Sequence, residues 1–285
     1  MTYAESILLG ALQGATEFLP VSSSGHLRLG EAALDIHFDS IVFDVALHLG
    51  TLVAVIVVYR HTIARLLRAP FQHSDQPFFS RPGTRAWGFL MLATVPTGLI
   101  AILLSKVLAP DLSIAVVGGL LLVNGGILLS SKLVERERAP DPYGHGEAPP
   151  PAAPPQDDFP ADWGLTPAKA FLIGVVQGIA VLPGISRSGT TITTALFCGV
   201  RPKAAAEFSF LLSIPAILGA GLKTASDLEH FDQSEIVIIG LGVLTSVVVG
   251  VIALKLLIRL VSNARFHTFA WYCFALGAIA LGLAR

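Results

Sequence analysis

Charged residues are scarce in this sequence of 285 residues. Asp, Glu, Lys and Arg make up 14% of it, whereas soluble domains carry about 25%. Apolar residues make up 53%, and the mean hydropathy is +0.70. These values exclude an ordinary soluble domain and favour a protein that lies in a lipid bilayer. The net charge of -1 gives no electrostatic basis for binding nucleic acid, so we expect no such partner.

Cysteine is almost absent, and so is a basic N-terminal region. The two cysteines, Cys198 and Cys273, stand alone in apolar stretches, which excludes a disulfide framework and a cysteine-based metal site. We expect both to serve packing. Glu5 stands where a secretory signal carries Lys or Arg, so the first apolar stretch is expected to remain in the mature protein.

Long apolar runs, in contrast, are abundant. A membrane-spanning helix needs about 20 mostly apolar residues. Six stretches meet this requirement: 41–59, 86–108, 114–133, 204–222, 235–259 and 264–284. Arg or Lys marks the ends of these stretches, as is typical of residues at the membrane interface. The sequence therefore predicts an all-α integral membrane protein with six transmembrane helices.

Two further apolar stretches are interrupted near their middle. Residues 3–35 contain Pro20 and a Ser-Ser-Ser-Gly-His run, and residues 166–200 contain Pro183 and a Ser-Arg-Ser-Gly run. Proline ends a helix, and non-helical backbone is tolerated at membrane depth only inside protein or beside a wet cavity. Both stretches are therefore predicted to be re-entrant helix-loop-helix hairpins.

The two hairpins repeat each other. Gln13-Gly14 precedes Ser22–Gly25 in the first, and Gln177-Gly178 precedes Ser186–Gly189 in the second, at identical offsets. Each hairpin is followed by three predicted spans. An odd number of spans between repeats reverses their orientation, so the pattern predicts an inverted-topology repeat.

This repeat divides the chain into three parts. Residues 1–138 form the first repeat and residues 164–285 the second, each with one hairpin and three spans. Residues 139–163 are rich in Pro, Ala and Asp, and are expected to form a flexible cytoplasmic linker. Basic residues cluster in the segments 60–85, 132–138 and 255–265. The positive-inside rule places these segments in the cytoplasm and both termini outside.

Polar residues inside the hairpins carry the functional signal. A carboxylate such as Glu17 is costly within a bilayer, and His26 follows the serine run at the start of a new helix. Arg187 stands among hydroxyls at the start of the helix in the second hairpin, and arginine binds phosphate through two parallel hydrogen bonds. Helix N-termini also bind anions. The alternative is structural: Arg187 caps a helix or pairs with Glu17.

Hydroxyls, an imidazole, a carboxylate and a guanidinium together provide what phosphoryl transfer requires. A transporter or flippase is the competing class, because inverted repeats, broken helices and a midplane anion site are its usual architecture. Transport alone does not require the nucleophile and base. A scaffold without a ligand leaves the grouping of Glu17, His26 and Arg187 unexplained.

The segments 13–26 and 182–191 resemble the two signature motifs of the undecaprenyl-diphosphatases linked to bacitracin resistance. The resemblance covers nearly the whole chain, including residues 207–212. It implies hydrolysis of undecaprenyl diphosphate to undecaprenyl phosphate and phosphate, which recycles the lipid carrier for cell-wall synthesis. It also implies a multi-pass protein of the bacterial inner membrane, with its active site facing the periplasm.

The resemblance further implies roles for single residues. Glu17 binds a metal or manages protons, Ser23 and His26 are candidate nucleophiles beside metal-activated water, and Arg187 holds phosphate. The other implied phosphate-binding residues are Ser22, Ser24, Gly25, Ser186, Ser188, Gly189 and Thr190. The implied cofactor is a divalent metal, Mg or Ca, held by Gln13 and Glu17. Many members have Glu at the position of Gln13, whose carbonyl can coordinate a cation but brings no charge.

Other polar residues lie within the predicted spans. Asp44, His48 and Glu207 either support the site or serve packing, and the sequence leaves both readings open. Asn124 and Thr97 are expected to tie helices together by hydrogen bonds. Glycines in the spans allow close helix packing, which permits a homodimer. The remaining expected partners are the lipid diphosphate and the membrane lipids.

Overall fold

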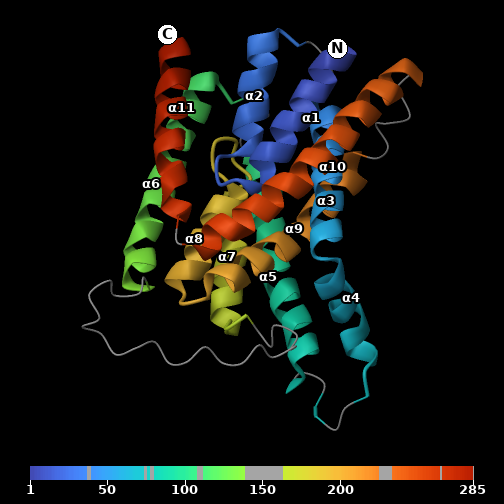
Figure 1. The fold of residues 1–285 in the computed structure, drawn as a ribbon, viewed down its shortest axis with the longest axis vertical. Helices are drawn as coiled ribbons and strands as arrows, with labels where there is room; N and C mark the ends of the chain where they lie inside the picture. Colours follow the sequence, from blue (N-terminus) through green and yellow to red (C-terminus); the bar gives the residue numbers. More distant parts are fainter. Residues whose placement is uncertain are drawn as a thin grey trace.

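The computed structural model describes residues 1–36, 40–73, 76–77, 80–107, 112–138, 163–224, 233–263 and 265–284, and the regular structure of these residues is helical (Figure 1). The helices of the first half are α1 (Tyr3–Phe18), α2 (Ser23–Leu34), α3 (Ser40–Val58), α4 (Arg60–Arg68), the 3-10 turn η1 (Ala69–Phe71), α5 (Pro82–Val107) and α6 (Ile114–Arg138). Those of the second half are α7 (Pro167–Ile179), α8 (Arg187–Phe197), α9 (Pro202–Thr224), α10 (Gln233–Ser262), the 3-10 turn η4 (Phe266–Thr268) and α11 (Phe269–Leu283).

The six predicted spans are confirmed as helices long and apolar enough to cross a membrane: α3, α5, α6, α9, α10 and α11. α11 begins five residues later than predicted because residues 266–268 form the turn η4. The sequence did not predict α4, a short amphipathic helix with Arg65 and Arg68 in its last turn. Most of the predicted linker, residues 139–162, lies outside the described residues.

Both interrupted stretches form a pair of helices joined by a short loop. α1 starts at a capping box in which Thr2 and Glu5 satisfy each other's backbone amides, and it ends two residues before Pro20. Ser22 then caps α2, and Ser186 caps α8 in the same way, each accepting a hydrogen bond from the amide three residues ahead. The predicted helix-loop-helix form is thus present in both halves.

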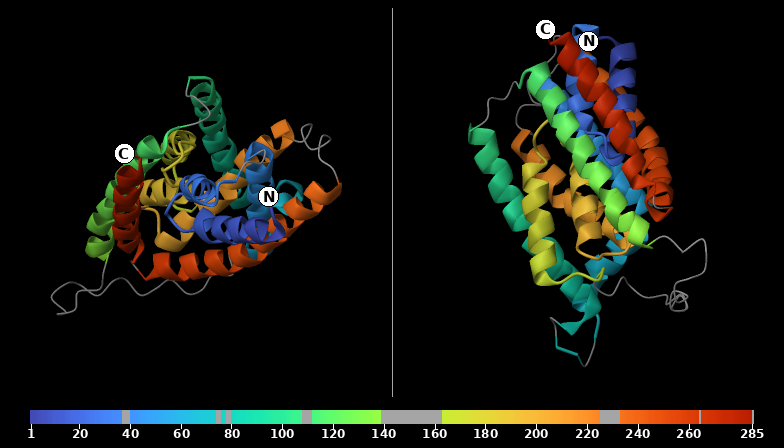
Figure 2. Two further views of the ribbon diagram at one scale, coloured as in Figure 1. Left: turned by 90° about the horizontal axis from the view of Figure 1, so that it is seen from above. Right: turned by 90° about the vertical axis from the view of Figure 1, so that its left-hand side faces the viewer.

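The first helix of each hairpin packs on a long helix from the other half of the chain. α1 lies along α10, and α7 lies along α5. Glycine makes these approaches close, because a Cβ on Gly10 would collide with the backbone of Gly242, and one on Gly174 with the backbone of Ala93. α6 and α11 pack together, as Figure 2 shows. Each half therefore completes the packing of the other.

The arrangement gives the molecule two distinct ends. The chain termini lie at the same end, together with the open end of the hairpin α1–α2 (Figure 1). α4 and the start of α5 lie at the opposite end. The loops of the two hairpins lie between these ends, in the interior of the helix bundle.

Candidate functional site

The loops of the two hairpins are in direct contact. The amide of Gly184 donates a hydrogen bond of 2.9 Å to Oγ of Ser22, the residue that caps α2. Gly184 has a φ of +106°, and a Cβ there would collide with α6, so both its conformation and its surroundings require glycine. Oγ of Ser188 donates to the carbonyl of Leu19 at 3.4 Å. The two helix N-termini, those of α2 and α8, are therefore brought together.

Asn124 on α6 holds both loops. Its Nδ2 donates to the carbonyl of Pro20 at 2.9 Å, and its Oδ1 accepts from the amide of Ser186 at 3.0 Å. The side chain is fully buried. The prediction that Asn124 ties helices together is therefore confirmed, and the elements that it joins to α6 are the two hairpin loops.

Glu17 lies at the centre of the resulting cluster. One carboxylate oxygen, Oε1, accepts a hydrogen bond from Nη2 of Arg187 in the opposite hairpin. The other, Oε2, accepts from Oγ of Ser23 at 2.6 Å and from Nε2 of Gln13 at 3.1 Å. The imidazole of His48, on α3, approaches the same oxygen to 3.4 Å. Glu17 and Gln13 are both buried, so the contacts replace solvent around the charge.

His26 lies on the first turns of α2 and is oriented by two hydrogen bonds. Its Nδ1 lies 2.8 Å from the carbonyl oxygen of Ser22, and its Nε2 lies 2.7 Å from the hydroxyl of Tyr272 on α11. A carbonyl oxygen can only accept, so Nδ1 carries a proton. In the neutral imidazole, Nε2 is then the acceptor and holds the lone pair.

The implied phosphate-binding residues all lie on the two loops or the helix turns that follow them. Ser22 and Ser24 approach each other to 3.5 Å, and Ser186 and Ser188 to 3.1 Å. Gly25 and Gly189 donate their amides to the capping serines, and Oγ1 of Thr190 donates to the carbonyl of Ser186 at 2.6 Å. Of the residues that the sequence singled out for the site, Gln13, Ser23 and Arg187 contact Glu17 directly. The others lie on the two adjoining loops or on the helix turns that follow them.

Two buried atoms of this cluster are without a hydrogen-bond partner in the described part of the chain: Nη1 of Arg187 and Oε1 of Gln13. A donor and an acceptor that are both desolvated and unpaired are costly unless a ligand completes them. An anion fits the first atom, and a cation fits the second. The cluster is therefore built like a binding site for a phosphate-bearing ligand together with a metal.

The oxygen atoms of Glu17 and Gln13 suit a hard divalent cation. Among the described residues, no three His, Cys, Asp or Glu side chains gather closely enough to hold an ion by themselves. The oxygens of Glu17 and Gln13 are hard donors that Mg²⁺ and Ca²⁺ accept, and Mg²⁺ is commonly held by one or two carboxylates plus substrate phosphates. The donor set therefore fits a metal that is shared with a phosphate ligand.

The other polar residues of the spans lie at four separate places. His48 joins the cluster through Glu17, whereas the carboxyl of Glu207 accepts from Thr62 on α4, away from it. The carboxyl of Asp44 shares a hydrogen bond with Glu31 on α2. Thr97, as predicted, ties two helices together by donating to the carbonyl of Gly174 on α7.

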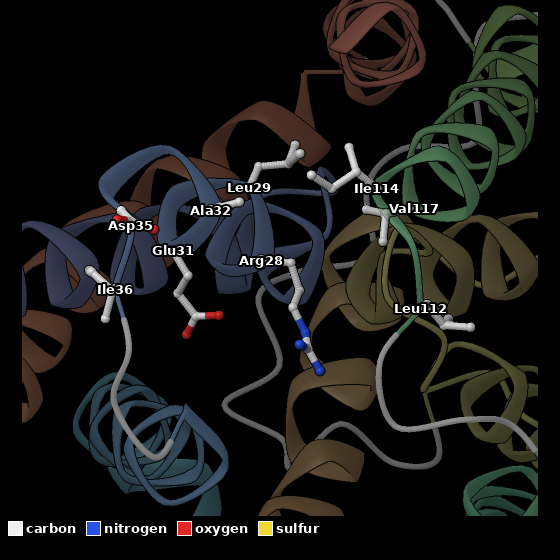
Figure 3. Close-up of a pocket in the computed structure, with 9 residues that line it drawn as sticks. All are labelled: Arg28, Leu29, Glu31, Ala32, Asp35, Ile36, Leu112, Ile114 and Val117. Atoms are coloured by element: carbon white, nitrogen blue, oxygen red, sulfur yellow. The ribbon is translucent and has the colours of Figure 1, made fainter. Parts of the chain in front are cut away.

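A pocket of about 240 Å³ opens beside α2, between that helix and the start of α6 (Figure 3). Arg28 and Glu31 form its polar side, and Leu112, Ile114 and Val117 form its apolar side. It shares α2 with the cluster, but Glu17, Ser23 and Arg187 are not among the residues that line it.

Tyr272 and His48 are the contacts of the cluster that sequence analysis did not assign to it. No local pattern marks Tyr272, which stands in an otherwise apolar span 246 residues after His26. His48 is one of several polar residues in the spans, and only its position opposite Glu17 separates it from the others. Only their positions in the structure show that Tyr272 and His48 belong to the cluster.

The fold has six helices that are long and apolar enough to cross a membrane. A buried polar cluster around Glu17 and Arg187 lies where the two hairpins meet. Together these features define a multi-pass membrane protein with an internal polar site. The sequence profile of the family described as Bacitracin resistance protein BacA matches residues 6–279. The chain therefore belongs to this family.

Individual relatives agree with this assignment over almost their whole length. An undecaprenyl-diphosphatase of Desulfosudis oleivorans is 41% identical, with 97% of each chain covered. One from Desulforapulum autotrophicum is 35% identical, over 99% of this chain and 98% of the relative. One from Methanosphaera stadtmanae is 36% identical, over 97% and 96%. The resemblance seen in the two motifs thus extends through all six spans.

Proposed function

We propose that the protein hydrolyses undecaprenyl diphosphate to undecaprenyl phosphate and phosphate. This reaction recycles the lipid carrier for cell-wall synthesis and confers resistance to bacitracin. The pairing of Arg187 with Glu17, which a structural role would also produce, is present where two helix N-termini meet. The observation that carries the proposal is the other guanidinium nitrogen, Nη1, which is buried and has no hydrogen-bond partner among the described residues. The names of the relatives, undecaprenyl-diphosphatases at up to 41% identity, support the choice of substrate.

Substrate binding depends on Arg187 and the two loops. The free Nη1 of Arg187 offers a charged hydrogen bond to a phosphate oxygen, while Nη2 stays with Glu17. The first turns of α2 and α8 add helix dipoles and the hydroxyls of Ser22, Ser24, Ser186, Ser188 and Thr190. Together these groups stabilise the negative charge that spreads over the phosphoryl oxygens during transfer.

Three groups can deliver the attack on phosphorus: Ser23, His26 and water. Glu17 accepts the hydroxyl proton of Ser23 in a hydrogen bond of 2.6 Å, so it is placed to act as the base for this serine. His26 presents its Nε2 lone pair. In each case the bond between phosphorus and the bridging oxygen breaks, undecaprenyl phosphate leaves with the electron pair, and water finally supplies the oxygen of the released phosphate.

A divalent metal, Mg or Ca, is part of the proposal. Glu17 and Gln13, whose Oε1 has no partner among the described residues, would hold it together with oxygens of the phosphate ligand. When bound, it supplies charge that offsets the negative oxygens of the diphosphate and lowers the pKa of a bound water. Because Gln13 is neutral, the site has one negative charge fewer than a site with two carboxylates.

The proposal also fixes how the protein sits in the membrane. The hairpins α1–α2 and α7–α8 are re-entrant, and the two halves form an inverted repeat in the bacterial inner membrane. Support comes from the exchange of partners, since α1 packs on α10 and α7 on α5. The basic end with α4 then faces the cytoplasm, and the active site opens to the periplasm. Pairing of two copies as a homodimer stays a prediction.

The test is phosphate release from a polyprenyl diphosphate by the full chain purified in detergent. We expect turnover in the parent protein and its loss in Ser23→Ala, His26→Ala and Arg187→Ala, each still folded by circular dichroism and gel filtration. Thr245→Ala is the control, because the Thr245 hydroxyl donates to the carbonyl of Leu241 in its own helix. Retained turnover in Arg187→Ala would contradict the proposed site.

The same assay separates the enzyme from a transporter. Hydrolysis needs no membrane barrier, so it persists in detergent, whereas transport has no meaning there. A protein that binds the lipid diphosphate in detergent and releases no phosphate would favour the transporter. Trapping a phosphorylated residue and mapping it by mass spectrometry then identifies the nucleophile, and the absence of such a residue favours direct attack by water.

A further inference from the structure

The hydroxyl of Tyr272 forms a hydrogen bond with Nε2 of His26, the nitrogen that carries the lone pair of the neutral ring. The hydroxyl oxygen of Tyr272 lies 2.7 Å from Nε2 of His26, and the two rings lie side by side with centroids 5.6 Å apart and planes 6° from parallel. Tyr272 belongs to α11, the last span, whereas His26 follows the serine run of the first hairpin. This contact joins the end of the chain to the catalytic loop near its beginning.

The direction of this hydrogen bond follows from the other nitrogen. Nδ1 of His26 faces the carbonyl of Ser22 at 2.8 Å and must donate, which leaves Nε2 of the neutral ring as an acceptor. The hydroxyl of Tyr272 is therefore the donor. The contact holds the imidazole in the single tautomer in which Nε2 can attack phosphorus or take a proton.

The Tyr272 hydroxyl lies where a substrate group would have to approach Nε2 of His26. A phosphorus atom or a proton that reaches Nε2 must arrive along the lone pair, where the Tyr272 hydroxyl now lies. If an incoming phosphate takes this position, the Tyr272 hydroxyl is displaced from Nε2 but its ring stays next to His26, so the hydroxyl can reach an oxygen of that phosphate. A phenol that has lost its imidazole acceptor can donate to such an oxygen without moving its ring.

Tyr272 lies at the surface of the helix bundle, whereas His26 lies beneath it. Tyr272 is 48% exposed, whereas His26 is 6% exposed, so the tyrosine separates the buried imidazole from the outside of the helix bundle. The interior side of the same loop is already held by Asn124, which bonds to Pro20 and Ser186.

We propose that Tyr272 is a further phosphate-contacting residue of this site, whose hydroxyl bonds to Nε2 of His26 in the empty protein and to a non-bridging phosphate oxygen in the loaded one. The inference deepens the proposed function and rests on it for the identity of the substrate. The ligand chemistry that it requires is a phosphate or diphosphate group, from a lipid or free in solution.

The test uses Tyr272→Phe in the full chain, which keeps the aromatic ring and removes only the hydroxyl. Binding of inorganic pyrophosphate is measured by calorimetry in the presence of Mg²⁺. Loss of one hydrogen bond to a charged group weakens binding by about tenfold or more. Tyr59→Phe is the matched control: it removes a tyrosine hydroxyl from a ring that stacks on Phe210, away from the cluster, and its affinity should equal that of the parent.

Nitrogen NMR of histidine-labelled protein supplies a second readout that a merely structural role would not move. The Nε2 resonance of His26, identified by its absence in His26→Gln, should shift when pyrophosphate is added to the parent, because the tyrosine hydroxyl leaves it. In Tyr272→Phe the resonance should start at the position of a nitrogen without an accepted hydrogen bond. Unchanged pyrophosphate affinity in Tyr272→Phe, or an Nε2 resonance in the parent that does not respond to pyrophosphate, would overturn the inference.

Both readouts are independent of hydrolysis, so the two proposals can fail separately. A tenfold loss of pyrophosphate affinity with no turnover of lipid diphosphate in the parent supports the phosphate contact and contradicts the enzyme. If the lipid diphosphate turns over while Tyr272→Phe keeps its full affinity, the enzyme stands and the tyrosine contact falls. Comparing undecaprenyl diphosphate with inorganic pyrophosphate in the same two proteins shows whether lipid and free phosphate groups use the contact equally.

Discussion

Single residues explain why a carboxylate can persist inside this bundle. Glu17 receives a charged hydrogen bond from Arg187 on one oxygen and two neutral ones, from Ser23 and Gln13, on the other. Each of these contacts offsets part of the cost of removing a carboxylate from water. The same contacts place a base beside a serine hydroxyl, so stability and chemistry depend on the same residues.

The coupling of Glu17 and Arg187 is testable by a double-mutant cycle. Glu17→Gln leaves the buried guanidinium without its counter-charge, and Arg187→Gln leaves the carboxylate without its cation. Each single change is expected to cost about 3–5 kcal/mol of unfolding free energy, as broken buried ion pairs do. Because the pair is lost only once, the double variant should be less destabilised than the sum of the singles. Strict additivity in denaturant titrations would contradict the contact.

Gln13 offers a sharper test of the metal. Gln13→Glu places a second carboxylate about 3 Å from Glu17, by analogy with the present contact of 3.1 Å. Without metal the two like charges should lower the melting temperature. With Mg²⁺ they should raise it and lower the metal concentration for half-maximal turnover by about tenfold, because affinity for hard cations follows ligand charge. An unchanged metal requirement would place the cation elsewhere.

The sequence predicts the central residues of the cluster, but not all the residues that contact them. Glu17, Ser23, His26 and Arg187 stand out because charge and hydroxyls are unusual in apolar stretches. Tyr272 does not, since a single tyrosine near the start of a span is typical of a membrane interface. Its contact with His26 depends on how α11 packs against the first hairpin, and no local rule predicts such packing.

At the scale of helices, the site depends on the junction of two loops. Asn124 of α6 and the hydroxyl of Ser22 together make three hydrogen bonds that hold the loops in place. Ser22 adopts a φ of +69°, which is rare for a residue with a side chain. The strain is sustained because its hydroxyl bonds to amides of both hairpins, Gly25 and Gly184.

Asn124→Ala tests this junction. It leaves the carbonyl of Pro20 and the amide of Ser186 buried without the bonds that Asn124 makes. The expected loss of stability is about 2 kcal/mol or more, with turnover reduced further than stability alone requires, because both loops lose their common anchor. Thr245→Ala, on α10, removes a hydroxyl bonded within its own helix and should change little. Equal effects of the two changes would mean that Asn124 does not position the loops.

Helix prediction succeeded where length and apolarity decide and failed where neither does. The six spans follow directly from runs of apolar residues longer than a bilayer is thick. α4 was missed because Arg60–Arg68 is basic on one face and only nine residues long. The break before α11 was missed because the turn η4 depends on local hydrogen bonds, which an apolar run does not reveal.

Across the whole molecule, each half supplies a packing partner for the other. α1 rests on α10 and α7 on α5, and glycines allow both approaches. The matching offsets of Gln13 and Gln177, and of Ser22 and Ser186, anticipated the two similar hairpins. The reversal of one half relative to the membrane is a prediction from the number of spans, as is the side on which each end lies.

Cysteine labelling tests the predicted orientation in intact cells. Tyr3 and Phe71 are 55% and 88% exposed. Tyr3 begins α1, next to the N-terminus, and Phe71 ends the turn η1 that follows α4; the N-terminus and α4 lie at opposite ends of the molecule (Figure 1). In a Cys198→Ser background, where Cys273 stays buried, Tyr3→Cys should react with a membrane-impermeant maleimide from outside. Phe71→Cys should react only after the membrane is opened. The reverse pattern would invert the topology and move the active site to the cytoplasmic side.

The most direct measurement is an experimental structure of the protein with methylenediphosphonate, a diphosphate that cannot be hydrolysed, in the presence of Mg²⁺. The account predicts phosphonate oxygens within hydrogen-bond distance of the Arg187 guanidinium, between the loops that begin α2 and α8. A diphosphonate bound in the pocket beside Arg28, with Arg187 contacting Glu17 alone, would contradict it.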